Sequence, residues 1–110
     1  MPGEGDHGAL TEGVFLILLS LLTPRHGYAV MQHVGRLTKG RVMLGAGTLY
    51  GAINSLLERG WITSVDDDEG DSRRKRYVIT DIGREALARE QQRLTELLAI
   101  AAEEQKVAQK

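Results

Sequence analysis

The chain of 110 residues leaves room for one domain with a modest core but not for two. It contains no cysteine, which excludes disulfides and thiolate metal sites, and nothing in it indicates secretion. The formal net charge of −1 is unusual for a nucleic-acid-binding protein, but the distribution of the charges matters more than their sum.

Basic residues gather in the middle of the sequence. Between positions 24 and 64 the sequence contains five basic residues and one acidic residue, Glu58. Residues 73–76 are all basic. The acidic residues lie near the N-terminus, in 66–71 and along the last predicted helix. The folded chain can therefore present one basic face although its total charge is close to zero.

The first predicted element is a helix over residues 9–22, which follows a glycine-rich, charged segment, 1–8, that we expect to be disordered. Eight of the nine residues from Val14 to Leu22 are apolar, a run far below the roughly 20 residues that span a bilayer. Acidic residues precede the run, so neither a membrane helix nor a signal peptide is predicted and we expect a cytoplasmic protein. A helix that is apolar all round is buried all round, which in a small domain favours a second subunit against one face.

A second helix is predicted from about His26 to Leu37, where Lys39-Gly40 ends it. Its apolar face is expected to consist of Tyr28, Val30, Met31, Val34 and Leu37. A short irregular or extended link over 41–44 then leads into the next helix.

The third predicted helix, over about 46–59, carries most of the information about function. Its apolar stripe follows the spacing i, i+4, i+7 and i+8 and consists of Leu49, Ile53, Leu56 and Leu57. The other face carries small or hydrogen-bonding groups, with no carboxylate before Glu58. A helix that is buried on one side and lined with short polar groups on the other can lie in a DNA major groove. Gly60 is expected to end the helix, because glycine adopts the left-handed conformation at low cost.

A β-hairpin and a long helix complete the chain. Residues 61–65 and 74–79 are predicted strands, joined by a turn over 66–72 that is rich in Asp and also contains Gly and Ser. Thr80 can cap the last helix, which is expected to continue to about residue 108. Its leucine-rich seam has a repeat of seven residues, which predicts an arm that packs against the first helix or against the same helix of a second chain.

Together these elements predict a mainly α-helical fold with a small β-hairpin (α+β), in the order of a winged helix-turn-helix with a long C-terminal dimerisation helix. The DNA-binding domain is expected to span residues 9–80 and the dimerisation helix residues 81–110.

The chain resembles the PadR family of bacterial transcriptional regulators, in its short form with a single C-terminal helix. The motifs that carry the resemblance are PRHGY at 24–28, GTLY at 47–50, LERGWI at 57–62 and RKRYVITDIG at 74–83. The resemblance implies a dimeric winged-helix repressor that binds a pseudo-palindromic operator in double-stranded DNA. The third helix would enter the major groove, the wing over 62–79 would contact the backbone or minor groove, and the first and last helices would form the homodimer.

The sequence departs from the family pattern in two places. Gly45-Ala46 stands where the family often has Ser-Pro, so we expect a glycine N-cap on the third helix. In the drug-responsive branch a tryptophan on the last helix lines a pore at the dimer interface, whereas Trp61 is the single tryptophan here and lies at the start of the wing. We therefore do not predict binding of flat aromatic drugs, and we leave open a small-molecule effector at the dimer interface.

Two sets of candidate site residues follow from this interpretation. The predicted DNA contacts are Thr48, Tyr50, Asn54, Ser55, Arg73, Arg74, Lys75 and Arg76, among which Arg74 and Lys75 are the preferred wing contacts. The predicted dimer interface consists of Phe15, Leu18, Leu22, Leu87, Leu94, Leu97, Leu98 and Ala101. The simpler alternative for the helix is that Tyr50 packs against the second helix and that Asn54 and Ser55 are merely solvated.

No metal site, cofactor or enzymatic activity is expected. His26 and His33 lack a third ligand at a useful spacing. The acidic turn resembles a calcium loop weakly, because its glycine comes one position early and Tyr77 stands where the closing Glu belongs. No nucleophile, base and orienting residue can be assembled from the spacings.

A different class of function stays open as the alternative. A winged-helix protein–protein interaction module that does not bind operators would fit the near-neutral total charge and the acidic turn.

Overall fold

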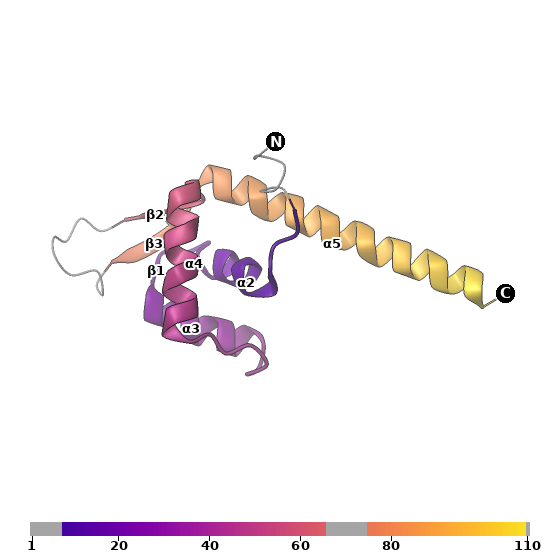
Figure 1. Cartoon of the computed structure of the whole chain (residues 1–110), viewed down its shortest axis with the longest axis horizontal. Coiled ribbons are helices and arrows are strands. Elements are labelled where there is room, and N and C mark those ends of the chain that lie inside the picture. The colour runs from indigo at the N-terminus through magenta and orange to yellow at the C-terminus, as the bar shows by residue number, and fades with distance from the viewer. Residues whose placement is uncertain (1–7, 66–74, 110) are drawn as a thin grey trace.

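The computed structural model describes residues 8–65 and 75–109. In chain order the elements of this part are α2 (Glu12–Ser20), β1 (Arg25–His26), α3 (Gly27–Leu37), α4 (Ala46–Arg59), β2 (Ile62–Ser64), β3 (Arg76–Ile79) and α5 (Asp81–Ala108) (Figure 1). The strands form a small antiparallel sheet in the order β1-β3-β2. This arrangement confirms the predicted fold class, a mainly helical winged helix-turn-helix with a long C-terminal helix.

Local signals define most helix ends. Thr11 caps α2 by accepting a hydrogen bond from the Val14 amide at 3.1 Å, and Thr80 caps α5 in the same way with the Gly83 amide at 3.1 Å. Gly45 is the N-cap of α4, and Gly60 ends that helix in the left-handed conformation with φ of 76°. The predicted limits of α4 are therefore confirmed, whereas α2 is shorter at both ends than the helix predicted over 9–22.

The strand β1 was not predicted from the sequence. Arg25 pairs with Tyr77 and His26 with Arg76 on β3, which turns the predicted hairpin into a three-stranded sheet. A two-residue strand has no periodicity to detect, and its pairing partner lies about fifty positions further along the chain. The Arg25 side chain also donates from Nε to the Ser20 carbonyl at 2.9 Å, which ties the strand to the end of α2.

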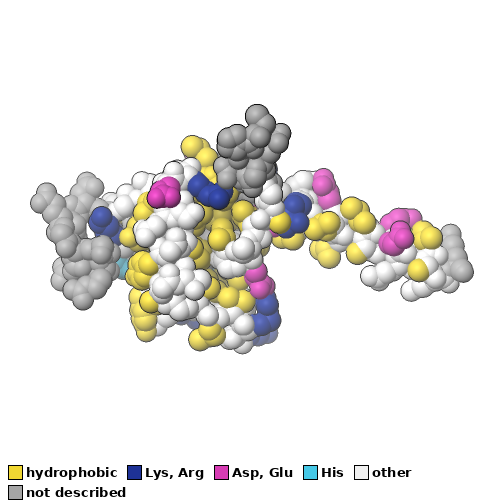
Figure 2. Space-filling model, in the orientation of Figure 1, with side chains coloured by type: hydrophobic (Ala, Val, Ile, Leu, Met, Phe, Trp, Pro, Cys, Tyr) yellow, Lys and Arg dark blue, Asp and Glu magenta, His cyan; other side chains and the backbone are white. Residues whose placement is uncertain are grey.

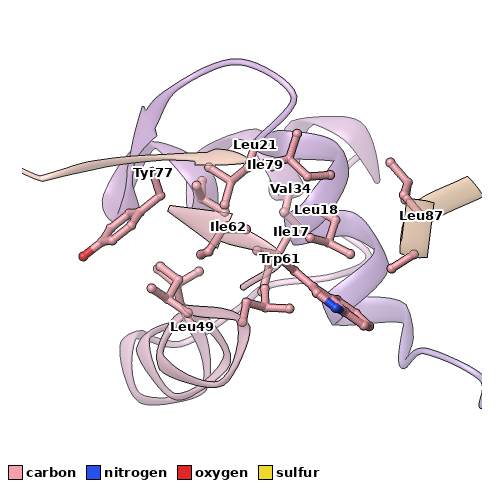
Figure 3. Packing of buried hydrophobic residues seen from close by; sticks show 14 residues of the cluster. Ile17, Leu18, Leu21, Val34, Leu49, Trp61, Ile62, Tyr77, Ile79 and Leu87 are labelled. Carbon is pink, nitrogen blue, oxygen red and sulfur yellow. The ribbon is translucent and has the colours of Figure 1, made fainter. Parts of the chain in front are cut away.

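The core lies between α2, α3, α4, the sheet and the first turns of α5 (Figure 3). Its largest buried side chains include Ile17, Leu18, Leu21, Leu49 and Ile53. This core fixes the exposed face of α4, because the opposite face is fully occupied by contacts within the subunit.

The junction between α4 and α5 is closely packed. Thr80 donates its backbone amide to the Trp61 carbonyl at 2.9 Å and its hydroxyl to the Gly60 carbonyl at 2.6 Å. A Cβ atom on Gly83 would lie 2.1 Å from the same Trp61 carbonyl oxygen, so only glycine fits there. These contacts fix the direction in which α5 leaves the domain.

Only the first turns of α5 pack on the domain, and the rest of the helix extends away from it (Figure 1). The longest dimension of the chain is 63 Å, against 36 and 21 Å in the other two directions. Within 8–65 and 75–109, no helix combines the length and the hydrophobicity that crossing a membrane requires. Disorder is expected for residues 1–8, and of these only Gly8 lies within the described residues.

Candidate nucleic-acid interface

The helix α4 has one buried and one exposed face. Leu49, Ile53 and Leu56 are at most 2% exposed and form the buried face. The exposed positions before the last turn are Ala46, Gly47, Thr48, Gly51, Asn54 and Ser55. The surface over α4 is largely white in Figure 2, the colour of uncharged polar side chains, glycine and backbone. Three of the predicted DNA contacts, Thr48, Asn54 and Ser55, thus lie together on this surface.

Tyr50 lies at the edge of the exposed face and packs against α3. A Cβ atom on Gly27 would lie 2.5 Å from the Tyr50 hydroxyl oxygen, so the ring covers the first residue of α3. Burial, with a smaller contribution from nearby Tyr50, raises the pKa of Tyr77 on β3. Tyr50 therefore packs against α3, which agrees with the simpler alternative that it packs against the second predicted helix.

The wing contributes basic side chains from β3. Arg76 is exposed and lies opposite His26 of β1, whereas Lys75, just before the strand, is half-buried. Tyr77 and Ile79 are buried and alternate along β3 with the exposed Arg76 and the half-buried Val78. The other predicted wing contacts, Arg73 and Arg74, lie outside the described residues, as does the acidic turn.

The exposed side of α3 was not among the predicted contacts. Tyr28, Gln32 and Arg36 are all exposed and follow one another at four-residue spacing along the helix. The prediction that Tyr28 and Leu37 belong to the apolar face was wrong, since Tyr28 is 65% and Leu37 49% exposed. The signal was present in the sequence, because Val30 and Val34 alone define the buried side and place position 28 on the opposite one.

His33 and His26 show no metal-binding arrangement. In the described ranges, no group of three or more His, Cys, Asp or Glu side chains could hold a metal ion. Burial and the neighbouring Arg25 and Arg36 lower the pKa of His33, so the neutral ring is favoured. His26 lies at the N-cap of α3 but makes no capping hydrogen bond with its side chain.

The predicted dimer residues fall into two groups. Leu22, Leu94, Leu97, Leu98 and Ala101 are exposed, and Phe15 is half-buried. Leu18 and Leu87 instead belong to the core of the subunit, 0% and 5% exposed, and have almost no surface left for a partner. Three large exposed apolar residues of α5, Ile82, Ile100 and Val107, were not predicted.

An ion pair between Glu90 and Arg93 of α5 lies beside the segment that precedes α2. Glu90 is 5% exposed, and its carboxylate accepts hydrogen bonds from Arg93 Nε at 3.0 Å and from the Leu10 amide at 3.3 Å. The Arg93 guanidinium, and after it the Leu10 amide, lower the pKa of Glu90 against the opposing effect of burial. A cavity of about 350 Å³ adjoins this pair and is also lined by Leu10, Phe15, Leu16 and Leu94.

Comparison with known structures agrees with this arrangement. A PadR family transcriptional regulator from Eggerthella lenta is 30% identical, with a TM-score of 0.66 over 82% of this chain and 78% of that one. A transcriptional regulator from Clostridium thermocellum has a TM-score of 0.69 at 21% identity, over 84% of this chain and 90% of that one. The PcaV regulator from Streptomyces coelicolor, solved in complex with its natural ligand, has a TM-score of 0.65 at 24% identity, over 89% and 68% of the two chains. The last two likenesses concern the fold.

No curated protein sequence matches the chain. The family model described as the transcriptional regulator PadR-like family matches residues 15–89, which include the whole helix-turn-helix, the wing and the start of α5. The expectation that the chain is not an enzyme is confirmed by this match. The chain belongs to the PadR-like family of transcriptional regulators.

Proposed function

We propose that the protein is a homodimeric repressor that binds a pseudo-palindromic operator through α4, α3 and the wing. The observation that carries the proposal is the exposed face of α4, where Thr48, Asn54 and Ser55 lie together. The opposite face of the helix is buried in the core. A helix held this rigidly can present the same hydrogen-bonding groups to a groove each time it binds.

Each contact surface has a separate role in this proposal. Asn54 can form two hydrogen bonds to an adenine edge, which gives sequence preference, and the hydroxyls of Thr48 and Ser55 can contact bases or phosphates. On α3, Tyr28, Gln32 and Arg36 form an exposed row suited to the phosphate backbone. The basic wing, 73–76, would add backbone contacts. Tyr50 would act through packing, by holding α3 against α4.

The proposed dimer forms through the exposed apolar residues of α5. Leu94, Leu97 and Leu98 lie beyond the domain on this helix, where contacts within the subunit do not cover them. A second copy would bury them, in line with the seven-residue repeat of the seam.

The cavity of about 350 Å³ beside Arg93 would then lie next to the dimer interface, and its volume falls in the range of small-molecule sites. We propose this cavity as the place for an effector.

Fluorescence anisotropy with labelled DNA from the region upstream of the gene, at two salt concentrations and against a scrambled duplex, tests the proposal. Tight binding to the upstream DNA alone, weakening steeply with salt, is the expected result. Arg36→Ala should weaken binding to all sequences and make the salt slope shallower by about one. Arg89→Ala removes the same charge from an exposed position on α5 and should leave both unchanged.

Asn54→Ala separates base reading from backbone binding. If Asn54 reads a base, the variant should lose about 1–3 kcal/mol of discrimination at one operator position and keep its salt slope. A uniform loss across all sequences would instead assign Asn54 to a phosphate.

The alternative function is a winged-helix module that binds another protein. One observation favours it, since no exposed position of α4 carries a positive charge before Arg59 while Glu58 is exposed. Under this alternative the wild-type protein would bind upstream and scrambled DNA equally weakly, and Arg36→Ala would change neither.

A further inference from the structure

Gly51 occupies the centre of the exposed face of α4. Its neighbours one helical turn away are Gly47 and Thr48 on one side and Asn54 and Ser55 on the other, and all are exposed. The proposed base contacts therefore surround a position that has no side chain.

Nothing described in the subunit explains this glycine. A Cβ atom added at Gly51 would meet no heavy atom of the described residues within 4 Å, and the backbone there does not adopt the left-handed conformation. Gly27 and Gly83 differ, because a Cβ atom on either would overlap Tyr50 or the Trp61 carbonyl. Glycine in the interior of a helix is unfavourable relative to alanine, so Gly51 weakens α4 without a benefit inside the subunit.

The exposed side chains around Gly51 are also short. Thr48, Asn54 and Ser55 extend only two or three atoms beyond Cα, so they can touch base edges only if the helix backbone lies close to the DNA. Any side chain at position 51 would stand between the helix and the groove.

We propose that Gly51 is a steric determinant of DNA binding, which lets the α4 backbone approach the DNA to van der Waals distance. This inference rests on the proposed function and adds to it a residue that makes no hydrogen bond of its own. An added methyl group would keep the helix away from the groove and lengthen every contact around it.

Gly51→Ala and Gly51→Leu test the inference. The alanine variant should be more stable than the wild type, with Tm higher by about 2–5 °C. Its affinity for the operator should nevertheless fall by about five- to hundredfold, and the leucine variant should bind more weakly still. Thermal unfolding and anisotropy on the same preparations give both quantities.

Gly13→Ala is the matched control. Gly13 lies in α2, and a Cβ atom there would make an ordinary contact with Leu44 at 3.7 Å. This variant should bind the operator like the wild type. Undiminished affinity of Gly51→Ala, or an equal loss in Gly13→Ala, would overturn the inference, as would a lower Tm for Gly51→Ala. If the wild type itself binds no operator, it is the proposed function that fails.

Discussion

Glu90 is a charged residue on the side of α5 that packs against the rest of the chain. It is buried to 95% and connects two parts of the chain that are 80 positions apart, because its carboxylate accepts the Leu10 amide as well as the Arg93 guanidinium. Arg93 lies one turn further along the same helix, so the pair also stabilises α5 itself. A single side chain thereby fixes the segment before α2 against α5.

Glu90→Gln should destabilise the folded protein by about 1–3 kcal/mol at neutral pH, because a hydrogen-bonded charge is removed while its partner stays in place. The folded state lowers the pKa of Glu90, so its stabilisation is present above the ordinary carboxyl pKa and is lost as the pH falls through the lowered value. The difference in unfolding free energy between wild type and variant should therefore shrink on acidification. Urea unfolding at several pH values measures it.

Glu12→Gln provides the control for that experiment. Glu12 also pairs with an arginine, Arg41, but both side chains are more than half exposed to solvent. Surface pairs of this kind contribute little, so this variant should stay close to the wild type at every pH. An equal effect of the two substitutions would show that burial of Glu90 is not what makes its pair important.

The element on which the proposed dimer depends is α5. Its first turns carry the buried Gly83, Ala86 and Leu87, whereas the apolar residues from Leu94 onward are exposed. The helix therefore belongs to the domain at one end and offers an unoccupied apolar seam at the other. In the proposed dimer, the distal half of this 28-residue helix, which is exposed in its own subunit, would gain most of its stability from the partner.

Leu98→Glu should convert the proposed dimer into monomers. Leu98 is 72% exposed, so its replacement leaves the core intact, but the charge would be buried without a partner in the seam. Sedimentation velocity measures the change, and Gln91→Glu, at another exposed position of α5, should leave the dimer unchanged. If both Leu98→Glu and Leu94→Glu sediment as dimers, the subunits do not meet along this arm.

On the scale of the whole molecule, the proposed DNA-binding parts and the arm lie apart. The free end of α5 points away from the domain. The hairpin of β2 and β3 lies at the opposite end of the long dimension of the structure (Figure 1). Two copies joined through their arms can therefore keep both α4 faces uncovered. An effector bound beside α5 would act on DNA binding by changing the angle between the subunits.

The symmetry of the proposed dimer predicts the form of its operator. Two α4 helices related by a twofold axis should enter major grooves about 34 Å apart, which corresponds to half-sites about one helical turn apart. Footprinting should show two protected half-sites with this separation. Inserting about five base pairs between them should abolish cooperative protection, because the half-sites then face opposite sides of the duplex. Protection of one half-site alone, without a second, would contradict the dimeric mode of binding.

Sequence signals were sufficient for several features that depend on local interactions. The limits of α4 and the caps at Gly45, Gly60 and Thr80 were all predicted correctly. Each depends on a helix end or a turn residue, which act between residues a few positions apart. The exposure of Thr48, Asn54 and Ser55 follows from the same helical spacing.

Tertiary structure alone decided the features that join distant parts of the chain. The strand β1 exists because Arg25 and His26 pair with β3. Tyr50 packs against α3 because Gly27, which has no side chain, leaves room for its ring. Leu18 and Leu87, predicted for the dimer, lie in the core because α2 and α5 meet within one subunit. Periodicity identifies which residues are apolar but not which surface covers them, since that depends on contacts between elements far apart in sequence.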